Sequence, residues 1–117
     1  MTDNDFLKAL KSASELEITF VGRKSGKKFS APVWFVQAGE KLYLLPVKGT
    51  ASQWYRSVVK NPMVEVQTSG RKVNARARPM KEGREVEEAL ERFREKYGAS
   101  DVKRYYPRQD VALELSI

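Results

Sequence analysis

The sequence contains neither cysteine nor histidine among its 117 residues. These two absences exclude disulfide bonds, cysteine and histidine zinc sites, thiolate nucleophiles, Ser-His-Asp triads and acid-base steps by imidazole. We therefore expect no metal site. An enzyme of this composition is expected to take its chemistry from a bound organic cofactor.

Long apolar runs are absent as well. The longest are Ala31 to Val36 and Leu42 to Val47, both far shorter than the roughly 20 residues that cross a bilayer as a helix. The first residues, MTDNDFLKALK, include acidic side chains and no apolar signal core. We expect no membrane span and a cytoplasmic location.

Basic residues outnumber acidic ones, with 22 Lys and Arg against 15 Asp and Glu, which leaves a net charge of +7. Such a balance favours anionic partners, and both nucleic acids and phosphorylated cofactors are of this kind. Hydrophobic residues make up 41% of the chain and charged residues 32%, which is typical of a globular protein. At this length we expect a single domain over residues 1–117.

The spacing of apolar residues predicts three helices and six strands. Helices are predicted at 3–14, 50–60 and 86–97, and strands at 16–20, 29–37, 42–47, 63–68, 73–78 and 111–117. This order indicates an α+β fold in which helices pack on a small antiparallel barrel. The predicted strand 29–37 is apolar on both faces from Ala31 to Val36, so we expect a central strand. We expect it to be interrupted at Pro32, because proline cannot donate a ladder hydrogen bond.

The segment VGRKSGKKF, residues 21–29, carries four basic side chains between two predicted strands. It is not a P-loop, because three residues instead of four separate its glycines and Lys27 is followed by Lys28. One interpretation is an ordinary hairpin turn with Gly26 at positive φ. Another is an anion site, since an anion would relieve the repulsion among the four cations.

A second anion site is predicted where the strand that ends at Lys48 and Gly49 meets a helix. Free backbone N–H groups and the positive end of the helix dipole would face outward there. Thr50 and Gln53 fit a capping box, and the indole of Trp54 adds a donor. The alternative is that these residues only cap the helix and that Trp54 belongs to the core. Two neighbouring anion sites suit a ligand with more than one negative group.

Five short motifs are spaced in a specific way. They are GRKSGK at 22–27, AP with a following aromatic at 31–34, LYLLPVKG at 42–49, WYRSVVKNP at 54–62 and VEVQ at 64–67. With these motifs the sequence resembles the deazaflavin-dependent nitroreductase family, within the pyridoxamine-phosphate oxidase-like superfamily of flavin-binding proteins. The resemblance implies a six-stranded antiparallel split β-barrel with flanking helices, and coenzyme F-420, a deazaflavin, as the cofactor.

The resemblance also implies a cofactor site in two parts. The anionic tail would contact Arg23, Lys24, Ser25, Lys48, Gly49, Trp54 and Tyr55. The ring would lie against Pro32, Val33, Trp34, Leu45, Pro46 and Val47. An aromatic segment would face the substrate, and its candidate proton donors are Tyr97, Tyr105 and Tyr106. The alternative for these tyrosines is that they only close the barrel.

The function implied by the resemblance is hydride transfer from reduced deazaflavin to a small unsaturated, quinone-like or nitroaromatic acceptor. An F-420-reducing dehydrogenase would be the indirect electron source, and a homodimer is implied. An FMN-binding split-barrel flavoprotein is the first alternative. The second is a non-enzymatic nucleic-acid-binding barrel that uses Lys24, Lys27, Lys28, Arg71, Lys72, Arg76 and Arg78. No aromatic pair is placed as a stacking platform, so we expect no nucleic-acid partner.

Overall fold

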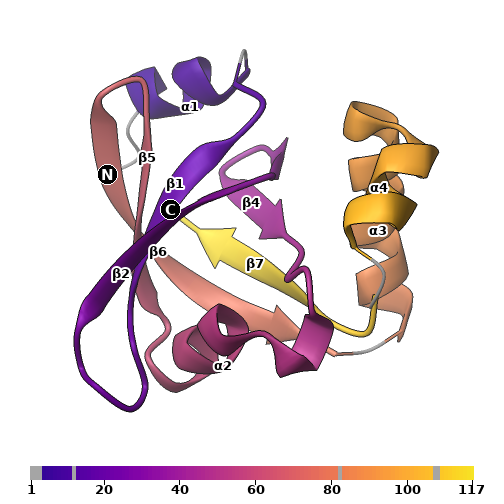
Figure 1. Cartoon of the computed structure of the whole chain (residues 1–117). Coiled ribbons are helices and arrows are strands. Elements are labelled where there is room, and N and C mark those ends of the chain that lie inside the picture. The colour runs from indigo at the N-terminus through magenta and orange to yellow at the C-terminus, as the bar shows by residue number, and fades with distance from the viewer. Residues whose placement is uncertain (1–3, 12, 82, 107–108) are drawn as a thin grey trace.

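A computed structural model describes residues 4–11, 13–81, 83–106 and 109–117 (Figure 1). The predicted domain 1–117 therefore includes positions 1–3, 12, 82, 107 and 108, which lie outside the described residues. The elements in chain order are α1 Asn4–Lys11, β1 Leu16–Val21, β2 Lys28–Val33, β3 Val36–Ala38, β4 Lys41–Leu44, the 3₁₀ turn η1 Gly49–Ala51, α2 Gln53–Lys60, β5 Met63–Thr68, β6 Arg71–Met80, α3 Gly83–Tyr97, α4 Ala99–Tyr105 and β7 Ala112–Ser116.

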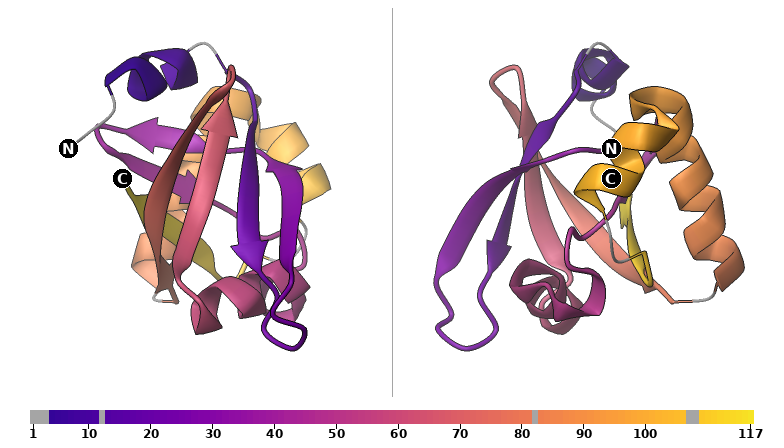
Figure 2. Two further views of the ribbon diagram at one scale, coloured as in Figure 1. Left: turned by 90° about the vertical axis from the view of Figure 1, so that its left-hand side faces the viewer. Right: turned by 45° about the vertical axis from the view of Figure 1, so that its right-hand side comes forward.

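The strands form one curled antiparallel sheet. Its seven strands lie in the order β2-β1-β5-β6-β7-β4-β3. Figure 2 shows that the arm containing β1 and β2 diverges steeply from the arm containing β4 and β7, with α2 across one end of the opening. The predicted α+β split-barrel architecture is confirmed, but the described residues form seven strands instead of the six expected.

The extra strand arises because the segment 29–37 forms two edge strands and not one central strand. Pro32 lies in β2 opposite Glu17 of β1, and an edge position tolerates proline because its missing N–H can face away from the ladder. The break comes later than predicted, at Trp34 and Phe35. The Phe35 N–H donates to the Tyr97 hydroxyl at 3.0 Å, so this peptide is held by α3 and the chain passes to the opposite arm.

Alternation along the strands divides the apolar side chains between two cores. In β7, Leu113 and Leu115 belong to the barrel interior, whereas Ala112 belongs to the core beneath α3 and α4. Phe6 of α1 and Val58 of α2 are fully buried in the interior core. The helices α1 and α2 thus close opposite ends of the half-barrel, and α3 and α4 cover its outer face (Figure 1).

The helix α3 follows its predicted pattern, with Val86, Ala89, Leu90 and Phe93 buried on one face. The helix α4 was not predicted from the sequence. It is seven residues long and buries only Val102, so its apolar pattern is too short to show a helical period. No helix in the described part of the chain is long and apolar enough to cross a membrane.

Candidate functional site

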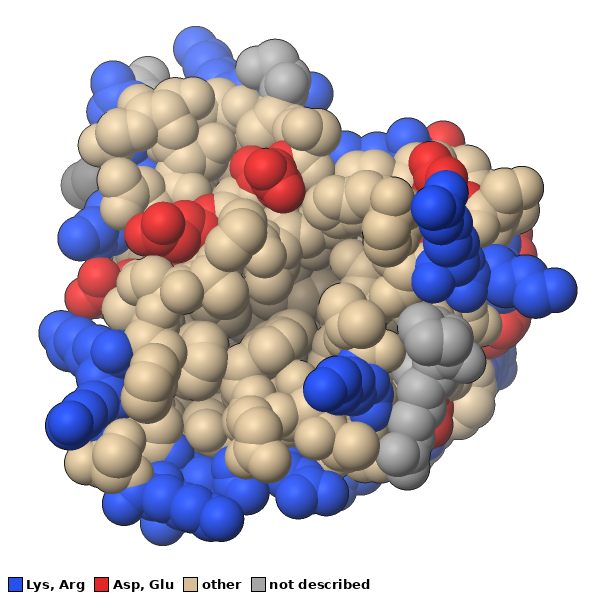
Figure 3. Space-filling view, viewed as in Figure 1, with Lys and Arg blue, Asp and Glu red and all other residues tan. Residues whose placement is uncertain are grey.

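An open cavity of about 470 Å³ lies between the outer edge of β2 and the segments that face it. It is lined by Glu15, Ala31, Pro32, Val33, Trp34, Leu45, Val47, Trp54, Tyr105 and Tyr106. We call it the aromatic cavity because four of these ten residues are Trp or Tyr. Figure 3 shows the hollow on this face, formed mainly by uncharged side chains, with Lys and Arg gathered along the lower edge of the molecule.

Stacked rings build one wall of the aromatic cavity. Trp34 lies parallel to Tyr97, with ring centroids 4.2 Å apart. The edges of Tyr105 and Tyr106 contact Trp34 at centroid distances of 5.2 and 6.0 Å. Such offset and edge contacts are favourable beyond the area that they bury. The connector between β2 and β3 is therefore fixed against α3 and α4.

The Tyr97 hydroxyl ties three segments together. Its oxygen lies 2.7 Å from the carbonyl oxygen of Ser14 and 2.8 Å from that of Phe35, and it accepts the Phe35 N–H. Burial, and to a lesser degree the charge of Glu15, raise the pKa of Tyr97 to about 12, although the hydrogen bond with the Phe35 backbone lowers it. Tyr97 stays protonated at neutral pH and does not line the cavity.

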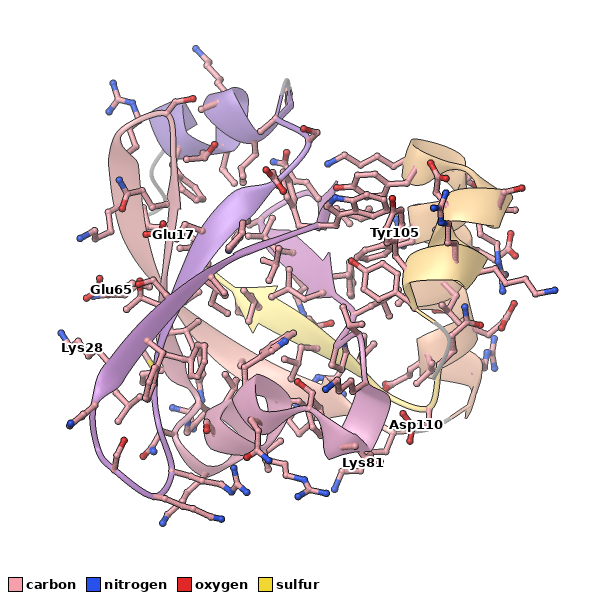
Figure 4. All side chains as sticks on the ribbon, viewed as in Figure 1. Glu17, Lys28, Glu65, Lys81, Tyr105 and Asp110 are labelled. Atoms are coloured by element: carbon pink, nitrogen blue, oxygen red, sulfur yellow. The ribbon has the colours of Figure 1, made fainter. Side chains whose placement is uncertain are left out.

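The other two candidate tyrosines line the cavity but differ in exposure. Tyr106 is 5% exposed, and burial, followed by the nearby Tyr97, raises its pKa well above the ordinary value. Tyr105, labelled in Figure 4, is 48% exposed. Of the three predicted proton donors, Tyr105 is therefore the one that both lines the cavity and meets solvent.

The basic segment 21–29 forms a hairpin turn between β1 and β2. The Gly22 N–H donates to the Lys27 carbonyl at 2.8 Å, and the Gly26 N–H donates to the Gly22 carbonyl at 3.0 Å. Gly26 has a φ of 71°, which favours glycine because other side chains are strained there. The segment is therefore a hairpin turn, as one interpretation predicted. A hairpin turn of this shape can also bind an anion, so the second interpretation stays a prediction.

The turn is docked on α2. The Arg23 backbone N–H donates to the Ser57 hydroxyl at 3.2 Å, and the Arg23 guanidinium donates to Gln53 Oε1 at 2.6 Å. Lys60 Nζ donates to the Arg23 carbonyl at 3.1 Å. These contacts enclose a second cavity, of about 270 Å³, which we call the turn cavity. It is lined by Phe20, Gly22, Arg23, Lys24, Ser25, Phe29, Gln53 and Ser57.

The two cavities take residues from the same two elements, β2 and α2, and we refer to the two cavities together as the groove. The strand β2 contributes Phe29 to the turn cavity and Pro32 to the aromatic cavity, while α2 contributes Gln53 to the first and Trp54 to the second. The groove is basic at the turn and apolar at the aromatic end. Within the described ranges, the Lys24 ammonium has neither a hydrogen bond nor an ion pair, so its charge is available to a ligand.

The prediction of free amides at the second anion site is wrong. The Gly49 N–H donates to the Pro46 carbonyl at 3.0 Å. The Thr50 N–H and hydroxyl both donate to the carboxylate of Asp110, at 3.2 and 2.9 Å. Asp110 lies 60 positions along the chain, so no local pattern reveals this contact.

The predicted capping box at Thr50 and Gln53 is wrong as well, because both side chains bond to residues that are distant in the sequence. The helix α2 begins at Gln53, and its N-cap is Ser52, whose hydroxyl accepts the Tyr55 N–H at 3.4 Å. The Gln53 side chain instead accepts from Arg23. Its role is to hold the turn, which the sequence pattern did not suggest.

The predicted cofactor residues fall into three groups. The aromatic cavity contains Pro32, Val33, Trp34, Leu45, Val47 and Trp54. The turn cavity contains Arg23, Lys24 and Ser25. Neither cavity is lined by Pro46, Lys48, Gly49 or Tyr55. The Tyr55 side chain is 4% exposed and packs in the interior core.

Sequence reasoning missed seven lining residues: Glu15, Ala31, Phe20, Gly22, Phe29, Gln53 and Ser57. Phe29 could have been found, because alternate residues of a strand share a face and Val33, four positions further on, was among the predicted residues. Glu15 had no signal, since it lies in the loop between α1 and β1, outside the five motifs.

Two of the basic residues of the nucleic-acid alternative are engaged in ion pairs. Arg78 lies 3.4 Å from Glu85 and 3.3 Å from Glu114, and Lys72 lies 3.7 Å from Glu65. These pairs reduce the positive charge that this face offers to a phosphate backbone.

Comparison of the sequence with protein-family models assigns the chain to a family. Residues 6–112 match the model of a family described as "Uncharacterized protein conserved in bacteria (DUF2255)". The chain belongs to this family. All residues that line the two cavities lie within the matched range. No curated protein matches the chain.

Solved structures share the fold. A protein named F420-H2 dependent reductase (FDR-A) is 27% identical, with a TM-score of 0.70 over 88% of this chain and 94% of that one. A structure described as a domain-swapped dimer is also 27% identical, with a TM-score of 0.70 over 88% and 80%. A Listeria innocua protein assigned as a pyridoxamine 5'-phosphate oxidase is 17% identical, with a TM-score of 0.68 over 96% and 90%. These likenesses agree with the predicted split-barrel fold.

Proposed function

We propose that this chain is an F-420-dependent oxidoreductase that transfers a hydride from the reduced deazaflavin to a small unsaturated, quinone-like or nitroaromatic acceptor. The observation that carries the proposal is the groove between β2 and α2, which is aromatic at one end and basic at the other. The 27% identity to an F420-H2 dependent reductase supports it. When bound, the deazaflavin supplies the hydride, and the chain binds, orients and shields the ring.

The aromatic cavity fits a flat ring in size and chemistry. Its volume of about 470 Å³ lies within the range of roughly 300–1,000 Å³ that is usual for ligand pockets. Apolar contacts come from Pro32, Val33 and Leu45, and aromatic contacts come from Trp34 and Trp54. Because β2 is an edge strand, its outward carbonyl groups are free to accept hydrogen bonds from a ring N–H.

The turn cavity fits an anionic tail. Lys24 offers an ammonium without another partner in the described ranges, and Arg23 is held in position by Gln53 while its remaining N–H groups can donate. The Ser25 hydroxyl accepts the Lys27 N–H at 3.2 Å and keeps its own hydrogen for a ligand. We propose that these three residues hold the phosphodiester and that the ring extends toward Trp34.

The acceptor is proposed to enter at the side of the cavity where Tyr105 is exposed. A proton for the reduced product would come from water or from the Tyr105 hydroxyl. Tyr97 is assigned a positioning role, because its hydroxyl is occupied by the backbone of Ser14 and Phe35. An F-420-reducing dehydrogenase is the proposed source of the reduced cofactor.

The test is a titration of the purified protein with F-420. The chain has two tryptophans, and both line the aromatic cavity, so binding there is expected to quench the protein fluorescence and to change the fluorescence of the cofactor. Saturation at low micromolar F-420, or about −8 kcal/mol, is the expected result. Absence of binding at tens of micromolar contradicts the proposal.

The alternative is FMN, which carries a single phosphate in place of the longer anionic tail. The same titration with FMN separates the two cofactors, because the basic turn offers Lys27 and Lys28 beyond Arg23 and Lys24. Tighter binding of F-420 is expected, and tighter binding of FMN would favour the alternative. We further propose that residues 1–117 act as one cofactor-binding domain and that the protein is a homodimer.

A further inference from the structure

The aromatic cavity contains one charged residue, Glu15, in the part of the chain that the structure describes. The other nine lining residues are uncharged. The turn cavity has the opposite character, because its charged residues are Arg23 and Lys24. The groove therefore changes sign along its length, from basic at the turn to acidic at the aromatic end.

Glu15 is held at this end by contacts on both sides of it. The carbonyl of the preceding residue, Ser14, lies 2.7 Å from the Tyr97 hydroxyl. The following residue, Leu16, is 3% exposed and opens β1. The same Tyr97 stacks on Trp34, so the loop that carries Glu15 and the aromatic wall share one support.

Glu15 is exposed and has no ion-pair partner among the described residues. A carboxylate beside an apolar wall attracts a cation more strongly than it does in open water, and the faces of Trp and Tyr attract cations as well. Both effects weaken the binding of an anion in the aromatic cavity.

We propose that Glu15 is a specificity-determining residue that makes the aromatic cavity prefer cationic, flat acceptors to anionic ones. For the acceptor this inference rests on the proposed function. The same charge keeps the anionic tail of the cofactor at the turn end, since the reversed orientation places the tail beside a carboxylate. Glu15 thus sets the direction in which the cofactor binds. It also selects acceptors that carry a positive charge, for example an N-alkylated nitrogen heterocycle.

The net charge of +7 does not reverse this preference. At physiological ionic strength, charges more than about 8 Å away are largely screened. Glu15 is itself exposed, but it lines the cavity and so acts at contact distance, whereas no lysine or arginine lines this cavity.

The test uses probes of one shape and three charges. N-methylquinolinium, quinoline and quinoline-2-carboxylate are titrated at pH 8 into the free protein, and binding is followed by quenching of Trp34 and Trp54. The cation is expected to bind about three- to tenfold more tightly than the anion. Glu15→Gln should remove the preference, and Glu15→Lys should invert it.

The matched control is Glu95→Gln, which changes the charge equally on the exposed outer face of α3 and should leave the ratio of the affinities unchanged. An equal affinity for cation and anion in the wild type, a cation that fails to quench at millimolar concentration, or a ratio that Glu15→Gln does not shift overturns the inference. The F-420 titration is separate. If F-420 binds and the probes show no charge preference, the proposed function stands and the role of Glu15 is contradicted. If the probes show the expected preference and F-420 does not bind, the role of Glu15 in the cavity stands and the proposed function is contradicted.

Discussion

At the scale of single residues, Lys24 separates the two interpretations of the basic turn. It is exposed and lines the turn cavity, so Lys24→Ala is expected to weaken F-420 binding about tenfold by removing one charge-assisted contact, with little change in the free energy of unfolding. Fluorescence titration measures the affinity and thermal unfolding measures the stability. Lys11→Ala makes the same charge change on α1, at the opposite end of the half-barrel. If both variants bind F-420 like the wild type, the turn is an ordinary hairpin.

Glu114 provides a residue-scale prediction on pH. Its side chain on β7 is 10% exposed and receives hydrogen bonds from Arg78 and Lys41. Burial alone would raise the pKa of Glu114, but these two cations together hold it below the ordinary value. The folded state therefore binds this proton less readily than the unfolded state, so the stabilisation is present above the ordinary carboxyl pKa and is lost as pH falls through the lowered pKa.

Glu114→Gln is accordingly expected to lower the free energy of unfolding by about 1 kcal/mol at pH 7, because Arg78 and Lys41 are half exposed and solvent screens the pair. The difference between wild type and variant should shrink when urea unfolding is repeated at progressively lower pH below 4. Glu40→Gln, in the exposed turn after β3, is the control. A loss of stability that stays constant across this range would show that the charge of Glu114 is not its cause.

Residue identity alone indicated those cavity-lining residues that depend on local chemistry. Four cations around a glycine turn indicated Arg23 and Lys24, whereas the proline at Pro32 was interpreted as a break in a central strand and in fact lies in an edge strand. Contacts between distant residues were not accessible in this way. Thr50 meets Asp110, and Gln53 meets Arg23, and in both cases a plausible local cap concealed the actual partner.

At the scale of elements, Tyr97 links α3, the loop after α1 and the connector between β2 and β3. Tyr97→Phe is expected to lower the free energy of unfolding by about 1–2 kcal/mol, because the buried Phe35 N–H loses its acceptor. Urea unfolding measures the change. Tyr105→Phe, at a half-exposed ring, serves as the control and should stay within a few tenths of a kcal/mol. Equal stability of the two variants would contradict the linking role.

Elements with a clear local period were predicted well. The strand β5 was expected at residues 63–68 and has those bounds, since its alternation is strict. Within the segment 29–37, residues 31–36 are all apolar, and a continuous run of this kind does not distinguish a buried central strand from two edge strands. What divides it is a hydrogen bond to Tyr97, 62 positions away.

At the scale of the whole molecule, exposed apolar side chains support the proposed homodimer. Val59 is 41% exposed and Met63 53%, and neither lines the two cavities; the edges of β2 and β3 have no strand beside them among the described residues. A related structure is described as a domain-swapped dimer. Light scattering coupled to gel filtration is expected to give twice the mass of one chain at tens of micromolar. The mass of a single chain at every concentration tested would contradict the dimer.

The strand β7 has a consequence for how ligand binding and unfolding are coupled. Among the described residues it is the strand that pairs with both arms, with β6 of the arm β2-β1-β5-β6 and with β4 of the arm β4-β3. The aromatic cavity takes Val33 from the end of β2 in the first arm and Leu45 from just after β4 in the second, so its shape depends on how β7 holds the two arms. A ligand in that cavity stabilises the folded state by mass action, and through β7 it slows amide hydrogen exchange across the entire sheet, including strands that it never touches.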